Sequence, residues 1–175
     1  MSQIKLRRLS MKKILLGLMS ALLFIGCSSS AVEENVKPAL VAGQNLEISL
    51  KDQNEKAHSS TAETKKVIFA LSKDAAHTCN DYFETKEPNY LETHNTLFVA
   101  DVSSAPSLIR SLFIMPGLKD FKHRVLILDD KSVAAPFRAG VDVEKIVVVS
   151  LDANKITNVK TISTKEELIA EVEAQ

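Results

Sequence analysis

The chain has few of the residues on which redox chemistry depends. Its 175 residues include only two cysteines, Cys27 and Cys79, and no tryptophan. The cysteines lie too far apart in the sequence to form a C-x-x-C motif. That motif is the usual dithiol site of a redox protein, so its absence argues against a disulfide oxidoreductase.

Other catalytic and ligand-binding signatures are missing as well. The sequence contains no glycine-rich phosphate loop and no G-x-S-x-G motif. Its four histidines, His58, His77, His94 and His123, do not have the spacing of metal ligands. His77 and Cys79 are two residues apart, so in a helix they point to different faces. We expect no metal site and no cofactor.

The charge balance excludes one class of partner. The whole chain has 22 basic and 22 acidic residues, but five basic and no acidic residues precede Cys27. From Cys27 onward 17 basic residues therefore stand against 22 acidic ones, a net charge of −5 with histidine neutral. Nucleic-acid binding needs a basic surface, so we expect no nucleic-acid partner. The acidic excess also gives no net attraction to anionic lipid.

The clearest signal lies at the N-terminus. Five basic residues, the last of which is Lys13, are followed by an apolar run of 12 residues, Ile14 to Ile25. This run is shorter than the roughly 20 residues that a membrane-spanning helix needs, and it fits a cleavable secretory signal. Its end, Leu23-Phe24-Ile25-Gly26-Cys27, resembles the lipobox of bacterial lipoproteins.

The lipoprotein resemblance implies a specific lipid modification and a specific location in the cell. It implies diacylglyceryl transfer to the Cys27 sulfur, cleavage before Cys27 and acylation of the new amino group. Several acyl chains make a stable membrane anchor. Ser28 resembles the residue found at this position in lipoproteins sorted to the outer membrane. We therefore expect a periplasm-facing protein of the cell envelope, anchored in the outer membrane. The initiator methionine is either Met1 or Met11.

The sequence divides into three parts. Residues 1–26 are the expected lipoprotein signal peptide, residues 27–43 a flexible tether, and residues 44–175 a single domain. The tether has three serines, two adjacent glutamates, a proline and a glycine, with no sustained apolar period. If Cys27 is lipidated, Cys79 is the only thiol of the domain, which then forms no internal disulfide.

The domain alternates strand and helix signals. An alternating strand at 46–50 leads to a return strand near His58, and the apolar runs 67–71, 97–100 and 125–128 have the length of buried strands. We expect a helix from Asp74 to about Lys86, and another from Pro106 that stops at Pro116-Gly117. The second helix is expected to turn four apolar side chains inward, those of Leu108, Ile109, Leu112 and Phe113.

The C-terminal third predicts a hairpin and a helix. Apolar segments at 146–149 and 156–162 flank a turn at 152–155. Two overlapping capping boxes follow, Ser163 with Glu166 and Thr164 with Glu167, at the start of the last helix.

This order of elements resembles the thioredoxin-like superfamily, particularly its secreted and peroxiredoxin-like branches. The resemblance runs from Gln44 to Gln175 and rests on element order. It implies an α/β fold, a three-layer sandwich whose mixed central sheet has helices on both faces. Where thioredoxins carry C-x-x-C, this chain has Ser72 to Ala76. Neither Pro116 nor Pro136 stands directly before the terminal hairpin, where the family has a cis-proline.

Cys79 has two interpretations. In one it is a peroxidatic or sensor thiol, activated by the helix N-terminus and one of Arg110, Arg124 and Arg138. In the other it is a small apolar core residue on the same helical stripe as Phe83. Peroxiredoxins have the pattern P-x-x-x-T-x-x-C, which Cys79 does not match. A peroxidase requires this thiol at the mouth of a pocket with an arginine nearby.

Polar residues follow two of the expected buried strands, and they form our candidate cleft. Lys73 and Asp74 come after the first strand, and Asp101 and Ser103 after the next. Ligands of open α/β sheets bind beyond the carboxyl ends of the parallel strands, and neighbouring strands would bring Asp74 and Asp101 together. The alternative is that Asp74 caps one helix, and Asp101 or Ser104 the next.

The sequence thus predicts a lipid-anchored envelope protein with a redox-degenerate thioredoxin-like domain. We expect a binding or accessory module whose partner is a periplasmic protein or a small ligand, with the membrane reached through Cys27. The competing hypothesis is a single-cysteine thiol peroxidase or sensor that uses Cys79.

Overall fold

The computed structural model describes residues 36 to 174. The predicted signal peptide, the predicted lipidation site Cys27 and the first part of the predicted tether lie outside the described residues. The strands are β1 (Ser49–Asp52), β2 (Ala57–Ser59), β3 (Lys66–Ala70), β4 (Thr96–Asp101), β5 (Leu126–Leu128), β6 (Ile146–Asp152) and β7 (Lys155–Ile162). The helices are α1 (Lys73–Phe83), α2 (Tyr90–Thr93), α3 (Ser107–Ile109), the π-helical turn η1 (Arg110–Ile114), α4 (Met115–Lys119), α5 (Lys131–Arg138) and α6 (Lys165–Glu173).

The strands form one mixed sheet in the order β2-β1-β5-β4-β3-β6-β7. The buried strands β3, β4 and β5 are parallel, whereas β6 is antiparallel to β3 and β1 is antiparallel to β5. In the register, Ile68 of β3 lies between Phe98 of β4 and Val148 of β6. Since β3 and β4 are neighbours, their C-terminal ends meet at the same edge of the sheet.

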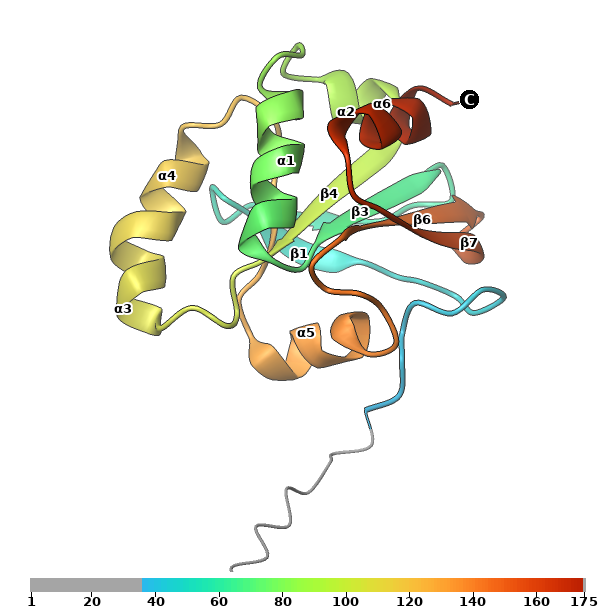
Figure 1. The fold of residues 1–175 in the computed structure, drawn as a ribbon, viewed down its shortest axis with the longest axis horizontal. Helices are drawn as coiled ribbons and strands as arrows, with labels where there is room; N and C mark the ends of the chain where they lie inside the picture. Colours follow the sequence, from blue (N-terminus) through green and yellow to red (C-terminus); the bar gives the residue numbers. More distant parts are fainter. Residues whose placement is uncertain (1–35, 175) are drawn as a thin grey trace, which may run out of the picture. The chain divides into compact units, whose positions relative to one another are not determined.

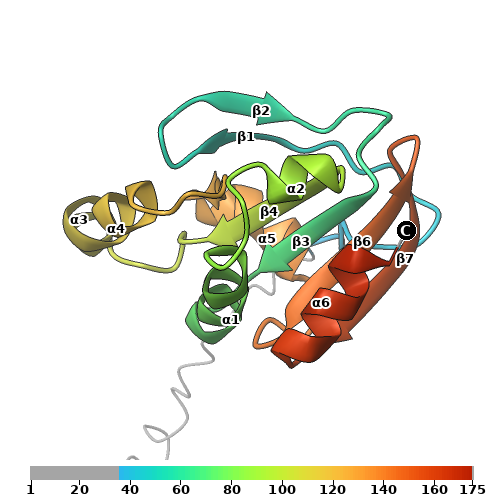
Figure 2. The same ribbon diagram turned by 90° about the horizontal axis from the view of Figure 1, so that it is seen from above.

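Side chains of the central strands alternate between two apolar cores. Ile68 and Phe98 pack with α1 and α6, whereas Phe69 and Val99 pack with α5 and with residues between 40 and 48. Figures 1 and 2 show α1 and α6 on one face of the sheet and α5 on the other. The expected three-layer arrangement, a mixed central sheet with helices on both faces, is confirmed.

Two helix starts show how the local sequence sets element boundaries. The side chain of Ser72 caps α1 by accepting a hydrogen bond from the backbone N–H of Ala75 at 3.4 Å, so Asp74 is not the cap. At α6 the capping box uses Thr164 and Glu167. The predicted overlap is thereby resolved in favour of the second pair, which satisfies backbone donors in the first turn.

The helix after β4 corrects the sequence-based prediction. The exposed fractions of Leu108, Ile109, Leu112 and Phe113 are 65%, 43%, 57% and 67%, so these side chains face outward. The residues that pack against the core come later, and they are Ile114, Met115 and Leu118. The segment therefore has apolar residues on two sides, and the prediction selected the wrong one.

Pro116-Gly117 does not end this helix, contrary to the prediction. The helical path continues through α3, η1 and α4 to Lys119. In η1 the backbone N–H of Met115 bonds to the carbonyl of Arg110, five residues earlier. Proline lacks an N–H and crowds the preceding turn, and a wide turn just before Pro116 leaves room for its ring.

The helix α5 was not predicted from the sequence. Asp130 caps it, because its carboxylate accepts bonds from the backbone N–H groups of Ser132 at 2.7 Å and Val133 at 3.3 Å. Pro136 lies inside this helix. A short helix with an internal proline has a weak sequence signal, and the packing of Ala134 and Phe137 on the sheet stabilises it.

The residues before Gln44 are already part of the packed structure. The backbone N–H of Ala39 donates to Pro136 at 2.9 Å, and that of Gly43 donates to Ile156 at 2.8 Å. Leu40 is buried in the core beneath α5. The packed part of the chain therefore begins within the last residues of the segment expected as a tether. Among the described helices, none is long and apolar enough to cross a bilayer.

Candidate functional site

Cys79 lies in the middle of α1 with its side chain in the core. It is 0% exposed and packs in the same cluster as Ile68, Phe83 and Phe98. Burial raises the pKa of its thiol, because the surroundings disfavour the charged thiolate. The thiol is free and buried. This environment does not fit the alternative of a peroxidatic thiol, which requires exposure and a lowered pKa.

The candidate arginines have other partners than Cys79. Arg138 forms an ion pair with Asp101 at 2.6 Å, and Arg124 forms one with Glu92 at 2.9 Å. Arg110 donates to the carbonyl of Val102 at 3.4 Å. Since an activating cation must lie next to its thiol, this arrangement provides no activation of Cys79.

The carboxyl ends of β3 and β4 are joined by Arg138 of α5. One nitrogen of its guanidinium, Nη1, donates to the carbonyl of Leu71 at 2.8 Å and to the carboxylate of Asp101 at 2.6 Å. The other carboxylate oxygen of Asp101 accepts from the backbone N–H of Ser103 at 2.8 Å. The Asp101 side chain is 0% exposed, and both of its oxygens are already bonded.

The four residues of the predicted cleft are therefore separated into two pairs. Asp101 and Ser103 are joined by a hydrogen bond and face inward, whereas Lys73 and Asp74 are exposed on the first turn of α1. In the described chain no hydrogen bond or ion pair links Asp74 with Asp101. Asp101 binds the backbone of its own turn and Arg138, as the alternative interpretation predicted in part, whereas Asp74 is exposed.

A second polar cluster lies around His123, whose place in the sequence indicated only that it lacks the spacing of a metal ligand. Its Nε2 is 3.0 Å from Oδ1 of Asn80, and its Nδ1 is 3.2 Å from Oε1 of Glu84. Burial lowers the pKa of His123, although the neighbouring Glu84 acts in the opposite direction. Gln53 ties the β1–β2 hairpin to this cluster through bonds to His123 and Val125.

This cluster borders a hollow of about 260 Å³, which is lined by Asp52, Gln53, Asn54, Pro88, Glu92, Phe121, Lys122, His123 and Arg124. Among its lining side chains Arg124 pairs with Glu92 at 2.9 Å, and Gln53 bonds to the backbone of His123 and Val125, which holds the hairpin against β5. Within residues 36 to 174, no three histidine, cysteine or acidic side chains converge as metal ligands do.

The most unusual surface feature is the outward side of α3 and η1. We call the side chains of Leu108, Ile109, Leu112 and Phe113 the 108–113 surface; each is at least 43% exposed. A second hollow of about 390 Å³ lies at its edge, lined by Ser107, Leu108, Arg110, Ser111 and Met115. Figure 1 shows α3 and α4 at one end of the molecule, away from α6 and β7. Contiguous exposed apolar side chains of this size mark interaction sites.

Comparison by sequence identifies no relative. No protein-family model matches the chain, and no curated protein matches it.

Comparison by structure finds thioredoxin-like proteins. The exposed lipoprotein thioredoxin Etrx1 of Streptococcus pneumoniae strain TIGR4 is 13% identical, covers 73% of this chain and 98% of its own, and has a TM-score of 0.50. StoA of Bacillus subtilis is 9% identical, with coverages of 75% and 99% and a TM-score of 0.49. The peroxidoxin BcpB of Mycobacterium tuberculosis is 15% identical, with coverages of 75% and 93% and a TM-score of 0.48.

The similarity to Etrx1, at a TM-score of 0.50, concerns the fold alone. The chain has a thioredoxin-like α/β fold, as its order of elements predicted. The sequence identities are too low to transfer an activity from any of these proteins.

Proposed function

We propose that this protein is a lipoprotein of the bacterial cell envelope whose thioredoxin-like domain is a binding or accessory module without thiol chemistry. In this proposal Cys27 carries the lipid, and the domain faces the periplasm from the outer membrane. The single observation that supports the absence of thiol chemistry is the complete burial of Cys79. A thiol that is 0% exposed cannot reach a peroxide or a disulfide substrate unless the core opens.

The strand ends support the same conclusion. In an open α/β sheet, this edge is where ligands bind. Here Arg138 and Asp101 bond to each other and to the local backbone. Both carboxylate oxygens of Asp101 accept bonds from the protein and the side chain is 0% exposed, so this carboxylate is directed at the fold and not at a ligand.

Binding is supported by the 108–113 surface. Its four apolar side chains do not contribute to the core, yet they lie together on adjacent helical turns. Exposed apolar area costs solubility, so a protein that maintains it on one face is expected to cover it.

Thiol reactivity of the full-length, lipidated protein tests the redox part of the proposal. With Cys27 acylated, Cys79 is the only thiol in the chain. We expect a thiol reagent to label it only after denaturation, at every pH from 5 to 9. Peroxide consumption is expected to be no faster than in the matched variant Cys79→Ala. Rapid labelling of the native protein, together with peroxide turnover that the variant lacks, would make the protein a thiol peroxidase.

The anchor is tested separately by growing cells with radiolabelled palmitate. The wild-type protein is expected to carry the label and to float with the outer membrane on a density gradient. In the variant Cys27→Ser the label is expected to disappear. Label that persists in this variant would overturn the proposed anchor, and label at inner-membrane density would overturn only the proposed location.

A further inference from the structure

The 108–113 surface is a protruding apolar ridge whose composition differs from that of the rest of the domain. From Val102 to Lys119 the chain has two basic residues, Arg110 and Lys119, and no acidic residue. The remainder of the chain after Cys27 has an acidic excess. This segment thus has a local charge of +2 within a domain that is acidic as a whole.

We propose that the 108–113 surface rests on the phospholipid bilayer and forms a second membrane contact beside the lipid on Cys27. This inference rests on the lipid anchor of the proposed function. Helices that lie in the plane of a membrane place aliphatic and phenylalanine side chains among the acyl chains, and they place basic side chains near the headgroups. Leu108, Ile109, Leu112 and Phe113 supply the first set, and Arg110 and Lys119 the second.

The length of the tether keeps the surface within reach of lipid. Eight residues, 28 to 35, separate Cys27 from the first described residue. An extended chain spans at most about 3.6 Å per residue, so these eight residues reach about 30 Å. That length is comparable to the diameter of a small domain. The anchor therefore holds the domain permanently close to the bilayer, where even a weak contact is occupied much of the time.

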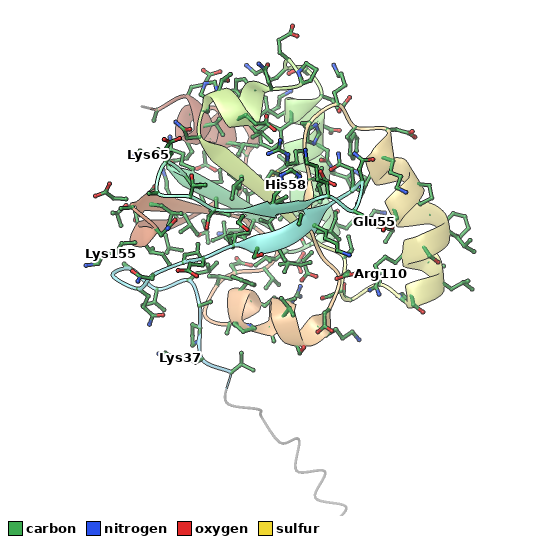
Figure 3. All side chains as sticks on the ribbon, turned by 180° about the vertical axis from the view of Figure 1, so that it is seen from behind. Lys37, Glu55, His58, Lys65, Arg110 and Lys155 are labelled. Atoms are coloured by element: carbon green, nitrogen blue, oxygen red, sulfur yellow. The ribbon has the colours of Figure 1, made fainter. Side chains whose placement is uncertain are left out.

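A fluorescent probe at the edge of the surface tests this inference. The full-length acylated protein is reconstituted into vesicles of phosphatidylethanolamine and phosphatidylglycerol, with an environment-sensitive dye on Ser111→Cys. The buried Cys79 and the acylated Cys27 leave the new cysteine as the reactive one. The matched control carries the dye on Lys155→Cys, which is exposed and lies on the opposite side of the molecule from Arg110 (Figure 3).

We expect the dye at position 111 to emit several-fold more strongly and at shorter wavelength than the dye at position 155. Lipids that carry a quencher in the upper acyl chain are expected to quench only the dye at position 111. Adding Leu112→Gln and Phe113→Gln is expected to return this dye to the emission seen in water, while the protein stays bound to the vesicles.

Three outcomes contradict the inference in distinguishable ways. A water-exposed dye at position 111 on vesicle-bound protein overturns the membrane contact and leaves the anchor intact. A shielded dye that lipid quenchers do not reach, and whose emission rises with protein density, shows that a second copy covers the surface. Protein that carries no acyl chain and washes off the vesicles overturns the anchor and, with it, this inference.

Discussion

Asp101 and Arg138 form an ion pair in which only the arginine reaches solvent. The Asp101 side chain is 0% exposed, and the Arg138 side chain is 34% exposed. A carboxylate without water depends on its bonds, so removing the arginine leaves an uncompensated buried charge. At the residue scale, this pair fixes α5 against the ends of β3 and β4.

Arg138→Ala is therefore expected to lower the free energy of unfolding by about 2–3 kcal/mol. Breaking a fully buried pair costs about 3–5 kcal/mol, and the partial exposure of Arg138 reduces that cost. Urea denaturation measures the change. The exposed pair of Lys145 with Asp142 is the control, and Asp142→Asn is expected to change stability by less than about 0.5 kcal/mol. Equal effects of the two variants would contradict this interpretation of the Asp101 pair.

At the scale of single elements, two residues before α6, Ser163 and Thr164, are possible N-caps, and the structure has Thr164 in this role. The Thr164 hydroxyl accepts from the backbone N–H of Glu167 at 3.2 Å, and the Glu167 carboxylate accepts from the N–H groups of Ser163 at 2.8 Å and Thr164 at 3.1 Å. We expect Thr164→Ala to cost about 1 kcal/mol of stability. Ser163→Ala is expected to stay within about 0.5 kcal/mol of wild type. Thermal melting of both variants measures this, and a larger loss in Ser163→Ala would assign the cap to the first box.

The β1–β2 hairpin depends on one carboxylate, which makes its stability sensitive to acid. Burial acts to raise the pKa of Asp52, but bonds from His58 at 2.7 Å and from the backbone N–H groups of Lys56 and Asn54 prevail and lower it. A carboxyl whose pKa is lowered by folding stabilises the native state above its ordinary pKa. That contribution is lost as the pH falls below about 4 and through the native-state pKa.

We therefore expect the free energy of unfolding to decrease steeply below pH 4, and less steeply in Asp52→Asn. At neutral pH, Asp52→Asn is expected to cost about 1–3 kcal/mol, because a charged acceptor of three bonds is replaced. Denaturation in urea at a series of pH values measures both effects. A variant with the same pH dependence as wild type would show that other groups dominate acid unfolding.

At the scale of the whole molecule, the buried residues that stabilise the fold are distinct from the exposed residues that remain available for contacts. Leu112→Gln with Phe113→Gln is expected to change the free energy of unfolding by less than about 0.5 kcal/mol for each substitution, because both side chains are exposed. The control is Leu118→Gln on the same helical segment, which is 8% exposed and is expected to cost at least about 2 kcal/mol. Thermal melting measures this, and a large loss in the double variant would mean that the surface supports the fold.

The sequence predicted the sheet better than the site. Continuous apolar runs and capping residues are local signals, so β3, β4, β5 and the terminal hairpin lie close to their expected positions. The site depends on contacts between distant residues. Asp101 and Arg138 are 37 positions apart in the sequence, so no local sequence pattern predicts that they form a pair. The helix α5, which carries Arg138, has an internal proline that obscured it.

The outward position of Phe113 was unpredictable for a related reason. Periodicity identifies an apolar stripe, but it does not tell which of two stripes on one helix faces the core. The π-helical turn at η1 also shifts the phase between α3 and α4, so a regular helical projection misplaces the residues before it. For Cys79 the helical stripe shared with Phe83 did indicate burial, and the structure places both in the core.

The segment before β1 gives the domain a defined response to mechanical load. Gly43 and Leu46 donate backbone bonds to Ile156 and Asn154, and Ile156 donates to Gln44. Because these bonds lie between the N-terminus and β1, a force applied through the N-terminus acts on them before it acts on β1. Residues 39 to 46 span at most about 25 Å when fully extended, so their release adds less than that to the length of the chain. Single-molecule pulling is therefore expected to show a short first extension at low force, before the strands of the sheet separate.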